Sequence, residues 1–255
     1  MRTAGASLTG REVSHARAIG DHHVGVHRFL RIFATALITA GLVVLADVGM
    51  TLAWKEPLSS IYGSIQQGKA EDDLAELQGR FPTEADLKTV SRIGDEKKRA
   101  ALLADRFAGE IHNGRGIGRI KIPSIDLDIV VVQGTDEASL EKGPGHYPDT
   151  ALPGQGKTIG IAGHRTTYLA PFHDINEIDD GNEVELEMPY GTFTYRVQKH
   201  EIVEPSDVEI VDNVGYERLV LTACHPLYSA AQRWAVFAKL TDLEVNDTPA
   251  SPGAR

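Results

Sequence analysis

Cys224 stands at the end of an apolar run, and its side chain is the one in this chain best suited to nucleophilic chemistry. It is the only cysteine in the sequence. An intramolecular disulfide is therefore excluded, and no cluster of thiols exists to bind zinc. Two uses remain, a nucleophile and a small buried hydrophobic residue. His164 and Arg233, which follows the cysteine by nine positions, are the side chains that would complete a nucleophilic site.

Cysteine, histidine and arginine together support acyl transfer. A thiolate attacks an amide carbonyl and an imidazolium protonates the leaving amine. A guanidinium, which stays charged at any relevant pH, stabilises the developing oxyanion. The competing interpretation gives these residues ordinary roles, with His164 on the surface and Arg233 in an ion pair.

The positions of the three residues along predicted strands favour a shared site. His164 follows the apolar run 158–163, in which side chains alternate between two faces. Cys224 ends the run 218–224 and shares a face with Thr222, while Arg233 opens the last run. If these strands are neighbours, the three side chains converge at one rim.

The sequence pattern after residue 118 predicts a mainly β domain. Short β-like runs alternate with turns that contain Gly and Pro. Many short strands with few helices predict a compact antiparallel barrel or sandwich of about 140 residues. The expected strands are 119–122, 127–133, 158–163, 183–187, 192–199, 201–203, 209–211, 218–224 and 233–240.

The segment 55–116 is polar and helix-like. Apolar residues recur there at three- and four-residue steps, interrupted by Gly79, Pro82 and Gly94. This pattern predicts two or three short amphipathic helices. They form either a stalk that holds the β domain away from a membrane or a layer that folds back on it.

An apolar stretch from residue 32 to 54 is long enough to cross a bilayer. At about 1.5 Å per residue it spans about 34 Å, against a hydrocarbon core of about 30 Å. Five arginines precede it, which predicts a cytoplasmic N-terminal tail and an extracellular C-terminal domain. The alternative is a signal peptide cleaved after Ala46. In either case the bulk of the chain is exported.

Composition excludes some partners. The formal net charge is −10, which argues against nucleic acid or an anionic lipid surface as the main partner. Hydrophobic residues make up 42% of the chain, enough to build a core in a domain of ordinary size. The acidic run 174–183 is typical of a solvated loop, so no metal and no cofactor are expected.

Three motifs in the expected order resemble the sortases of Gram-positive bacteria, most closely their class E housekeeping type. They are G-P-G-H-Y-P at 143–148, A-G-H-R-T-T-Y at 162–168 and L-T-A-C-H-P at 221–226, followed by Arg233. The resemblance covers residues 116–240. It implies a closed eight-stranded sortase-type β-barrel, preceded by a transmembrane helix and the short helices.

The resemblance also implies a function for each candidate residue. Cys224, His164 and Arg233 would be catalytic, and Tyr168, Thr222 and Ala223 would contact the substrate. The enzyme would be a membrane-anchored transpeptidase. It would cleave an L-A-x-T-G or L-P-x-T-G sorting signal of a surface protein between Thr and Gly. The acceptor would be a cell-wall amine, from a peptidoglycan precursor or a pilin.

The chain departs from the family pattern at three positions. The usual T-L-x-T-C reads V-L-T-A-C, with Val220 and Ala223 in place of threonines. Leu169 replaces a common glycine, and it could narrow the substrate groove. These departures support an alternative, a weak or inactive barrel that binds sorting signals or assists assembly.

An L,D-transpeptidase is a further alternative, but that family's compact histidine and cysteine signature is not found.

The expected domain boundaries follow from these segments. Residues 1–31 are a cytoplasmic tail, 32–54 a transmembrane helix in contact with lipid, and 55–116 a helical linker or stalk. Residues 117–242 form the catalytic barrel, and 243–255 a disordered C-terminal tail.

Overall fold

The computed structural model describes residues 13–53 and 57–246, and the chain divides into two compact units. The first unit is Met1–Trp54 and the second is Lys55–Arg255. Each is described by itself. Residues 1–12 of the tail expected at 1–31, and residues 247–255 of the tail expected at 243–255, lie outside the described residues.

The first unit contains one long helix, α1 (Val13–Ala53). Its stretch His27–Gly49 is apolar and long enough to cross a membrane, and none of it is buried. Leu37, Leu42 and Leu45 all lie on its exposed surface. A membrane anchor and a signal sequence both fit this helix.

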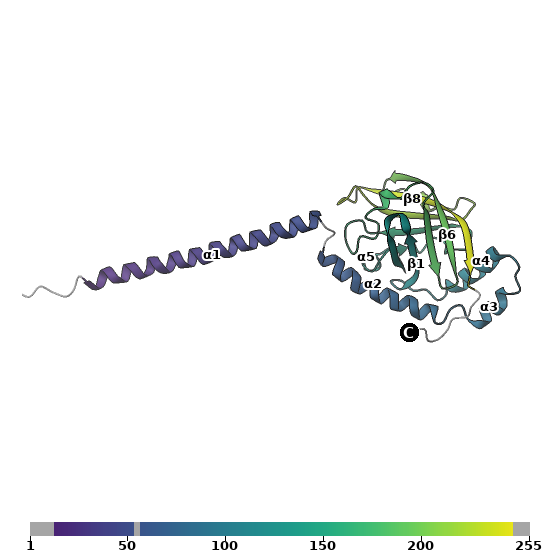
Figure 1. Cartoon of the computed structure of the whole chain (residues 1–255), viewed down its shortest axis with the longest axis horizontal. Coiled ribbons are helices and arrows are strands. Elements are labelled where there is room, and N and C mark those ends of the chain that lie inside the picture. The colour runs from purple at the N-terminus through teal and green to yellow at the C-terminus, as the bar shows by residue number, and fades with distance from the viewer. Residues whose placement is uncertain (1–12, 54–56, 247–255) are drawn as a thin grey trace, which may run out of the picture. The chain divides into compact units, whose positions relative to one another are not determined.

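The helical segment after it packs on the barrel instead of standing free as a stalk. It forms α2 (Pro57–Gln78), α3 (Glu84–Val90) and α4 (Glu96–Phe107). Helix α2 contacts β1 and β2, and α4 contacts β8 (Figure 1). The Phe81 ring meets that of Tyr190 edge to face with centroids 6.3 Å apart, and the Phe107 ring lies tilted against it at 5.3 Å. Aromatic packing of this kind joins the helices to the core.

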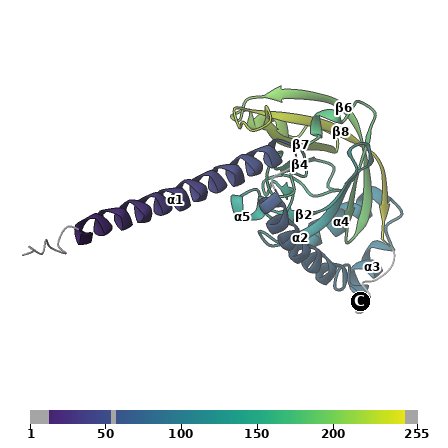
Figure 2. The same ribbon diagram turned by 60° about the vertical axis from the view of Figure 1, so that its left-hand side comes forward.

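Eight strands close into a barrel in the order β1-β2-β3-β4-β7-β8-β6-β5. The expected barrel is thus confirmed, and a sandwich is excluded. The long strands β6 and β8 run side by side (Figure 2). The strands are β1 (Gly116–Ile122), β2 (Leu127–Gln133), β3 (Gly145–His146), β4 (Thr158–Gly163), β5 (Glu183–Met188), β6 (Gly191–Val203), β7 (Arg218–His225) and β8 (Gln232–Val245).

The barrel is mixed, whereas the sequence predicted an antiparallel one. β2 pairs with β3 and β4 pairs with β7 in parallel ladders, and the other pairs are antiparallel. The difference arises because β5, β6 and their loops lie between β4 and β7 in the chain, which gives the long crossover that a parallel pair needs. β8 also runs to Val245, past the boundary expected at residue 242.

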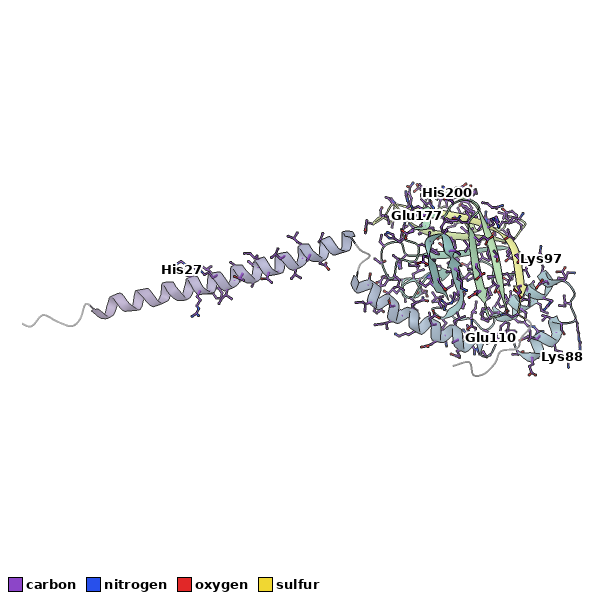
Figure 3. The ribbon with its side chains drawn as sticks, in the orientation of Figure 1. His27, Lys88, Lys97, Glu110, Glu177 and His200 are labelled. Atoms are coloured by element: carbon purple, nitrogen blue, oxygen red, sulfur yellow. The ribbon has the colours of Figure 1, made fainter. Side chains whose placement is uncertain are left out.

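Within the described residues, short helices lie in four of the connections between strands. They are the 3-10 helix η1 (Pro123–Ile125), α5 (Glu137–Leu140) and the 3-10 helices η2 (Ile175–Glu177) and η3 (Val208–Val211). The run 209–211, which was expected to be a strand, is part of η3. Figure 3 shows Glu177 and His200 toward one end of the barrel, and Lys88 and Lys97 of the helical layer toward the other.

Side chains alternate strictly on β7. Leu219, Leu221 and Ala223 lie in the core inside the barrel. Val220 instead packs outside, with Ala235 and Phe237 of β8. The outer face of β4, β7 and β8 is therefore the face that Thr222 and Cys224 share.

Candidate active site

The strand register brings the three predicted catalytic residues to one rim. Gly163 pairs with Ala223 in the parallel ladder, so His164 leaves β4 beside the end of β7. Cys224 and Arg233 are direct cross-strand partners in the antiparallel ladder. Residues opposite each other in such a ladder have Cβ atoms about 5 Å apart. The thiol and the guanidinium therefore start from adjacent positions on the same outer face.

The cysteine is a free thiol with partial solvent exposure. Arg233 donates from Nη1 to the carbonyls of Ala230 and Gln232, at 2.9 and 3.0 Å. These bonds tie the guanidinium to the turn between β7 and β8. A group held in this way is pre-oriented before any substrate arrives.

A cavity of about 680 Å³ opens on this face, and Thr222 and Arg233 both line it. The loop after β3 forms one wall and the loop before β7 forms the other. A cavity of this volume suits a short peptide segment. The hydroxyls of Thr222 and Tyr147 lie 2.9 Å apart across its floor. The lining residues are Thr135, Tyr147–Ala151, Gln155, Lys157, Thr158, Glu204, Pro205, Asp207, Val208, Ile210–Asn213, Thr222 and Arg233.

Two consecutive charged residues at the start of β7 hold these walls. Glu217 accepts hydrogen bonds from the backbone N–H groups of Gly154 and Gly156, at 2.9 and 2.8 Å, and so fixes the first wall. Burial raises the pKa of Glu217, against the effect of these bonds. Arg218 donates to the carbonyls of Ile210 and Asp212, at 2.7 and 3.0 Å, and fixes the second wall.

The His164 side chain is largely enclosed. Its Nε2 atom is buried and has no hydrogen-bond partner within the part of the chain that the structure describes. Burial lowers the pKa of His164, because a charged imidazolium is poorly solvated there, and the carboxylates of Glu141 and Glu137 act in the opposite direction. The Tyr168 ring lies 5.2 Å from the imidazole, between centroids.

Arg165 joins the histidine segment to the cysteine strand. Its side chain is 5% exposed. Nη1 donates to the carbonyl of Cys224 at 3.4 Å and lies 3.2 Å from Nδ1 of His225. Nε donates to the carbonyl of His173 at 3.2 Å, and Nη2 donates to Asn176. Burial lowers the pKa of Arg165, and the negative charge of Asp174 opposes this.

Of the three residues predicted to contact the substrate, Thr222, Ala223 and Tyr168, only one lines the cavity. Thr222 lines the cavity. The Ala223 methyl group lies in the barrel core and therefore does not point to the outer face that Thr222 and Cys224 share. Tyr168 donates from its hydroxyl to Glu141 at 3.0 Å and is not among the lining residues. Leu169 lies against Gly63 of α2, and it is not among the residues that line the cavity.

Within the described ranges, no group of three or more His, Cys, Asp or Glu side chains could hold a metal ion. Acyl transfer by cysteine, histidine and arginine requires no such group.

Comparison with known proteins identifies the family. A model described as a sortase domain matches residues 120–241. Sortase D of Bacillus subtilis (strain 168) is 32% identical over 177 residues, which cover 67% of this chain and 84% of that protein. This chain belongs to the sortase family. It is a cysteine transpeptidase with the barrel of that family.

Two further relatives agree with this assignment. Sortase SrtE1 of Streptomyces coelicolor is 25% identical over 268 residues, which cover 99% of this sortase and 63% of that protein. The solved structure of a Clostridium perfringens sortase D5 transpeptidase superimposes with a TM-score of 0.55 at 25% identity. It covers 69% of this chain and 99% of that one.

Sequence reasoning missed three residues that shape this sortase's site: Tyr147, Arg165 and Glu141. Tyr147 and Arg165 lie inside the motifs that indicated the family, so a signal for them was present in the sequence. Glu141 lies in none of those motifs. It reaches the site because α5 ends beside Tyr168, a contact that the sequence pattern does not encode.

We predict that Glu141→Gln lowers the pKa of His164 further. The amide keeps an acceptor for Tyr168 but removes a negative charge that favours the imidazolium. The measurement is the titration of the His164 ring resonance by NMR. Glu209→Gln, at an exposed position on η3, is the control and should leave the midpoint unchanged. A midpoint that rises or stays constant in Glu141→Gln contradicts this electrostatic account.

Proposed function

We propose that Cys224 is the nucleophile of this sortase, His164 its general acid and base, and Arg233 its oxyanion-stabilising group. The observation that carries this proposal is the register of β4, β7 and β8, which brings all three residues to one rim. Arg233 also lines the neighbouring cavity, whereas Cys224 and His164 are not among its lining residues.

The proposed reaction has two stages. The Cys224 thiolate attacks the carbonyl carbon of the Thr–Gly bond, and the oxyanion develops beside Arg233. His164 gives its proton to the leaving Gly amine, and a thioester remains on the cysteine. A primary amine then attacks the thioester. His164 accepts the proton of that amine, and the thiolate departs.

The proposed substrates are surface proteins with a C-terminal sorting signal of the L-A-x-T-G or L-P-x-T-G type. The proposed acceptor is a peptidoglycan precursor or a pilin amine. We assign this sortase to class E on its three motifs and its similarity to SrtE1 across 99% of the chain. Similarity to Sortase D, over a smaller share of the chain, makes class D the alternative assignment.

We propose that α1 is an uncleaved anchor in the plasma membrane, with its N-terminus in the cytoplasm and the barrel outside. Arg28 and Arg31 lie at the N-terminal end of its apolar stretch, and this distribution favours a cytoplasmic N-terminus. N-terminal sequencing of membrane-extracted protein distinguishes an intact chain from one cleaved after Ala46.

The positions of Val220 and Ala223 weaken the alternative of an inactive barrel, which rested on these two departures from the family pattern. Val220 packs with Ala235 and Phe237 outside the barrel, and Ala223 packs in the core. A valine and an alanine are suited to these apolar contacts, so the substitutions do not remove a group from the proposed machinery.

We predict that Cys224→Ala and His164→Ala each abolish cleavage of a sorting peptide by the full chain. Arg233→Ala should lower kcat by about 10²–10³, the usual cost of removing an oxyanion donor, with the thermal midpoint unchanged. Arg196→Ala is the matched control, because Arg196 forms an exposed ion pair with Glu183 on the neighbouring strand. Cleavage that persists in Cys224→Ala rules out the proposed mechanism.

We predict that the unmodified chain cleaves an L-A-x-T-G peptide faster than an L-P-x-T-G peptide in direct competition. Tyr168 contributes to this preference by holding the segment beside His164 through its bond to Glu141. Competition is repeated with Tyr168→Phe, which loses that bond and keeps the ring. Faster cleavage of the proline peptide by the unmodified chain refutes the preference. If the ratio of the two cleavage rates is the same in Tyr168→Phe as in the unmodified chain, the tyrosine hydroxyl is excluded as its source.

A further inference from the structure

The turn that follows the candidate catalytic histidine is conformationally strained. Tyr168, Leu169 and Ala170 have φ angles of +48°, +68° and +43°. Side chains with a Cβ atom rarely adopt this left-handed region, and three such residues in succession require support from surrounding structure. The turn begins four residues after His164, and the Tyr168 ring contacts the imidazole.

The support comes from the first turns of α2. Gly63 is buried against the strained turn. A Cβ atom at this position would lie 2.9 Å from Cγ of Leu169, 3.1 Å from the carbonyl carbon of Tyr168 and 3.2 Å from the Leu169 nitrogen. Only glycine leaves room for the turn. The hydroxyl of Ser59, one helical turn earlier, accepts a hydrogen bond from the Tyr168 N–H at 3.4 Å.

A carboxylate makes a second connection between α2 and the turn. Glu141, at the end of α5, accepts from the hydroxyl of Tyr168 at 3.0 Å and from that of Tyr62 at 3.4 Å. The two tyrosine rings meet edge to face with centroids 6.2 Å apart. Helix α2, α5 and the strained turn are thereby linked through one side chain.

Helix α2 is itself fixed to the barrel near this point. Gln67 accepts from the Val130 N–H at 2.7 Å and donates to the Lys142 carbonyl at 2.6 Å. These bonds fasten the helix to β2 and to the segment that follows α5. A helix fixed in this way can hold the strained turn in place.

We propose that the segment Ser59–Gly63 of α2 is a positioning element of the active site, which holds the Tyr168–Ala170 turn and through it the imidazole of His164. Gly63 and Leu169 form a matched pair. The absence of a side chain at Gly63 leaves the space that the Leu169 side chain occupies. The catalytic part of the proposal rests on the role assigned to His164 above.

The test compares two glycines of the same helix in the full-length chain. Gly63→Ala places a methyl group against the turn, whereas a Cβ at Gly68 meets nothing within 4 Å. Both substitutions favour a helix by similar amounts. Gly63→Ala should lower kcat for a sorting peptide at least tenfold with a smaller change in KM, and Gly68→Ala should stay within twofold of the unmodified chain.

A rescue variant separates positioning from general damage. In the double variant Gly63→Ala with Leu169→Gly, Cγ of Leu169, which would lie nearest to the new methyl group, is absent. The turn also relaxes, because glycine adopts positive φ readily. This double variant should recover most of the lost kcat. Equal kcat in the Gly63→Ala and Gly68→Ala proteins, or no recovery on adding Leu169→Gly, overturns the proposal.

A second measurement does not depend on turnover. The ring resonance of His164, assigned by its disappearance in His164→Gln, is recorded by NMR in the unmodified chain and both glycine variants. It should shift in Gly63→Ala and not in Gly68→Ala, and an unshifted resonance in both overturns the positioning claim. An unmodified chain that cleaves no sorting peptide contradicts the proposed function, while this resonance still tests the positioning.

Discussion

The parallel ladder between β4 and β7 determines where the candidate nucleophile and the candidate general acid lie. Parallel pairing puts the ends of both strands at the same rim, and the register Gly163 to Ala223 brings His164 and Cys224 out of the sheet together. The antiparallel pairing of β7 with β8 then adds Arg233 opposite the cysteine. A shift of one residue in either ladder would turn the side chains of the shifted strand to the opposite face and separate these residues, since successive side chains face opposite sides.

One buried charged side chain, that of Arg165, lies beside this rim. Arg165 is a buried cation whose direct hydrogen-bond partners are carbonyls, an amide and an imidazole. A charge in such a place must be well bonded to be tolerated. It connects the residue after His164 to the carbonyl of Cys224. The two segments that carry the nucleophile and the acid are therefore fastened to each other directly.

Local sequence patterns predicted much of this architecture. The apolar runs at 158–163 and 218–224 coincide with β4 and β7, and alternation along them correctly put Thr222 and Cys224 on one face. The two-residue strand β3 was missed because it is too short to have a periodicity. The run 209–211 was expected to be a strand, but it forms part of η3, where Ile210 and Val211 cover Val220 from outside.

What the sequence could not reveal are the contacts between distant segments. Gly63 looks like an ordinary helix glycine, and its importance comes only from the approach of Leu169, more than a hundred residues later. The same holds for Glu141, which accepts from tyrosines of two different elements. Such contacts have no spacing rule, because folding and not sequence distance brings the partners together.

The most direct test of the account is mass spectrometry of the full chain after brief incubation with an L-A-x-T-G peptide and no added amine. The account predicts a hydroxylamine-sensitive acyl adduct on Cys224, ending at the Thr of the peptide. The adduct should be absent from Cys224→Ala and reduced in Arg233→Ala. Cleavage of the peptide without an adduct on Cys224, or an adduct on another residue, would contradict the assignment of this rim as the active site.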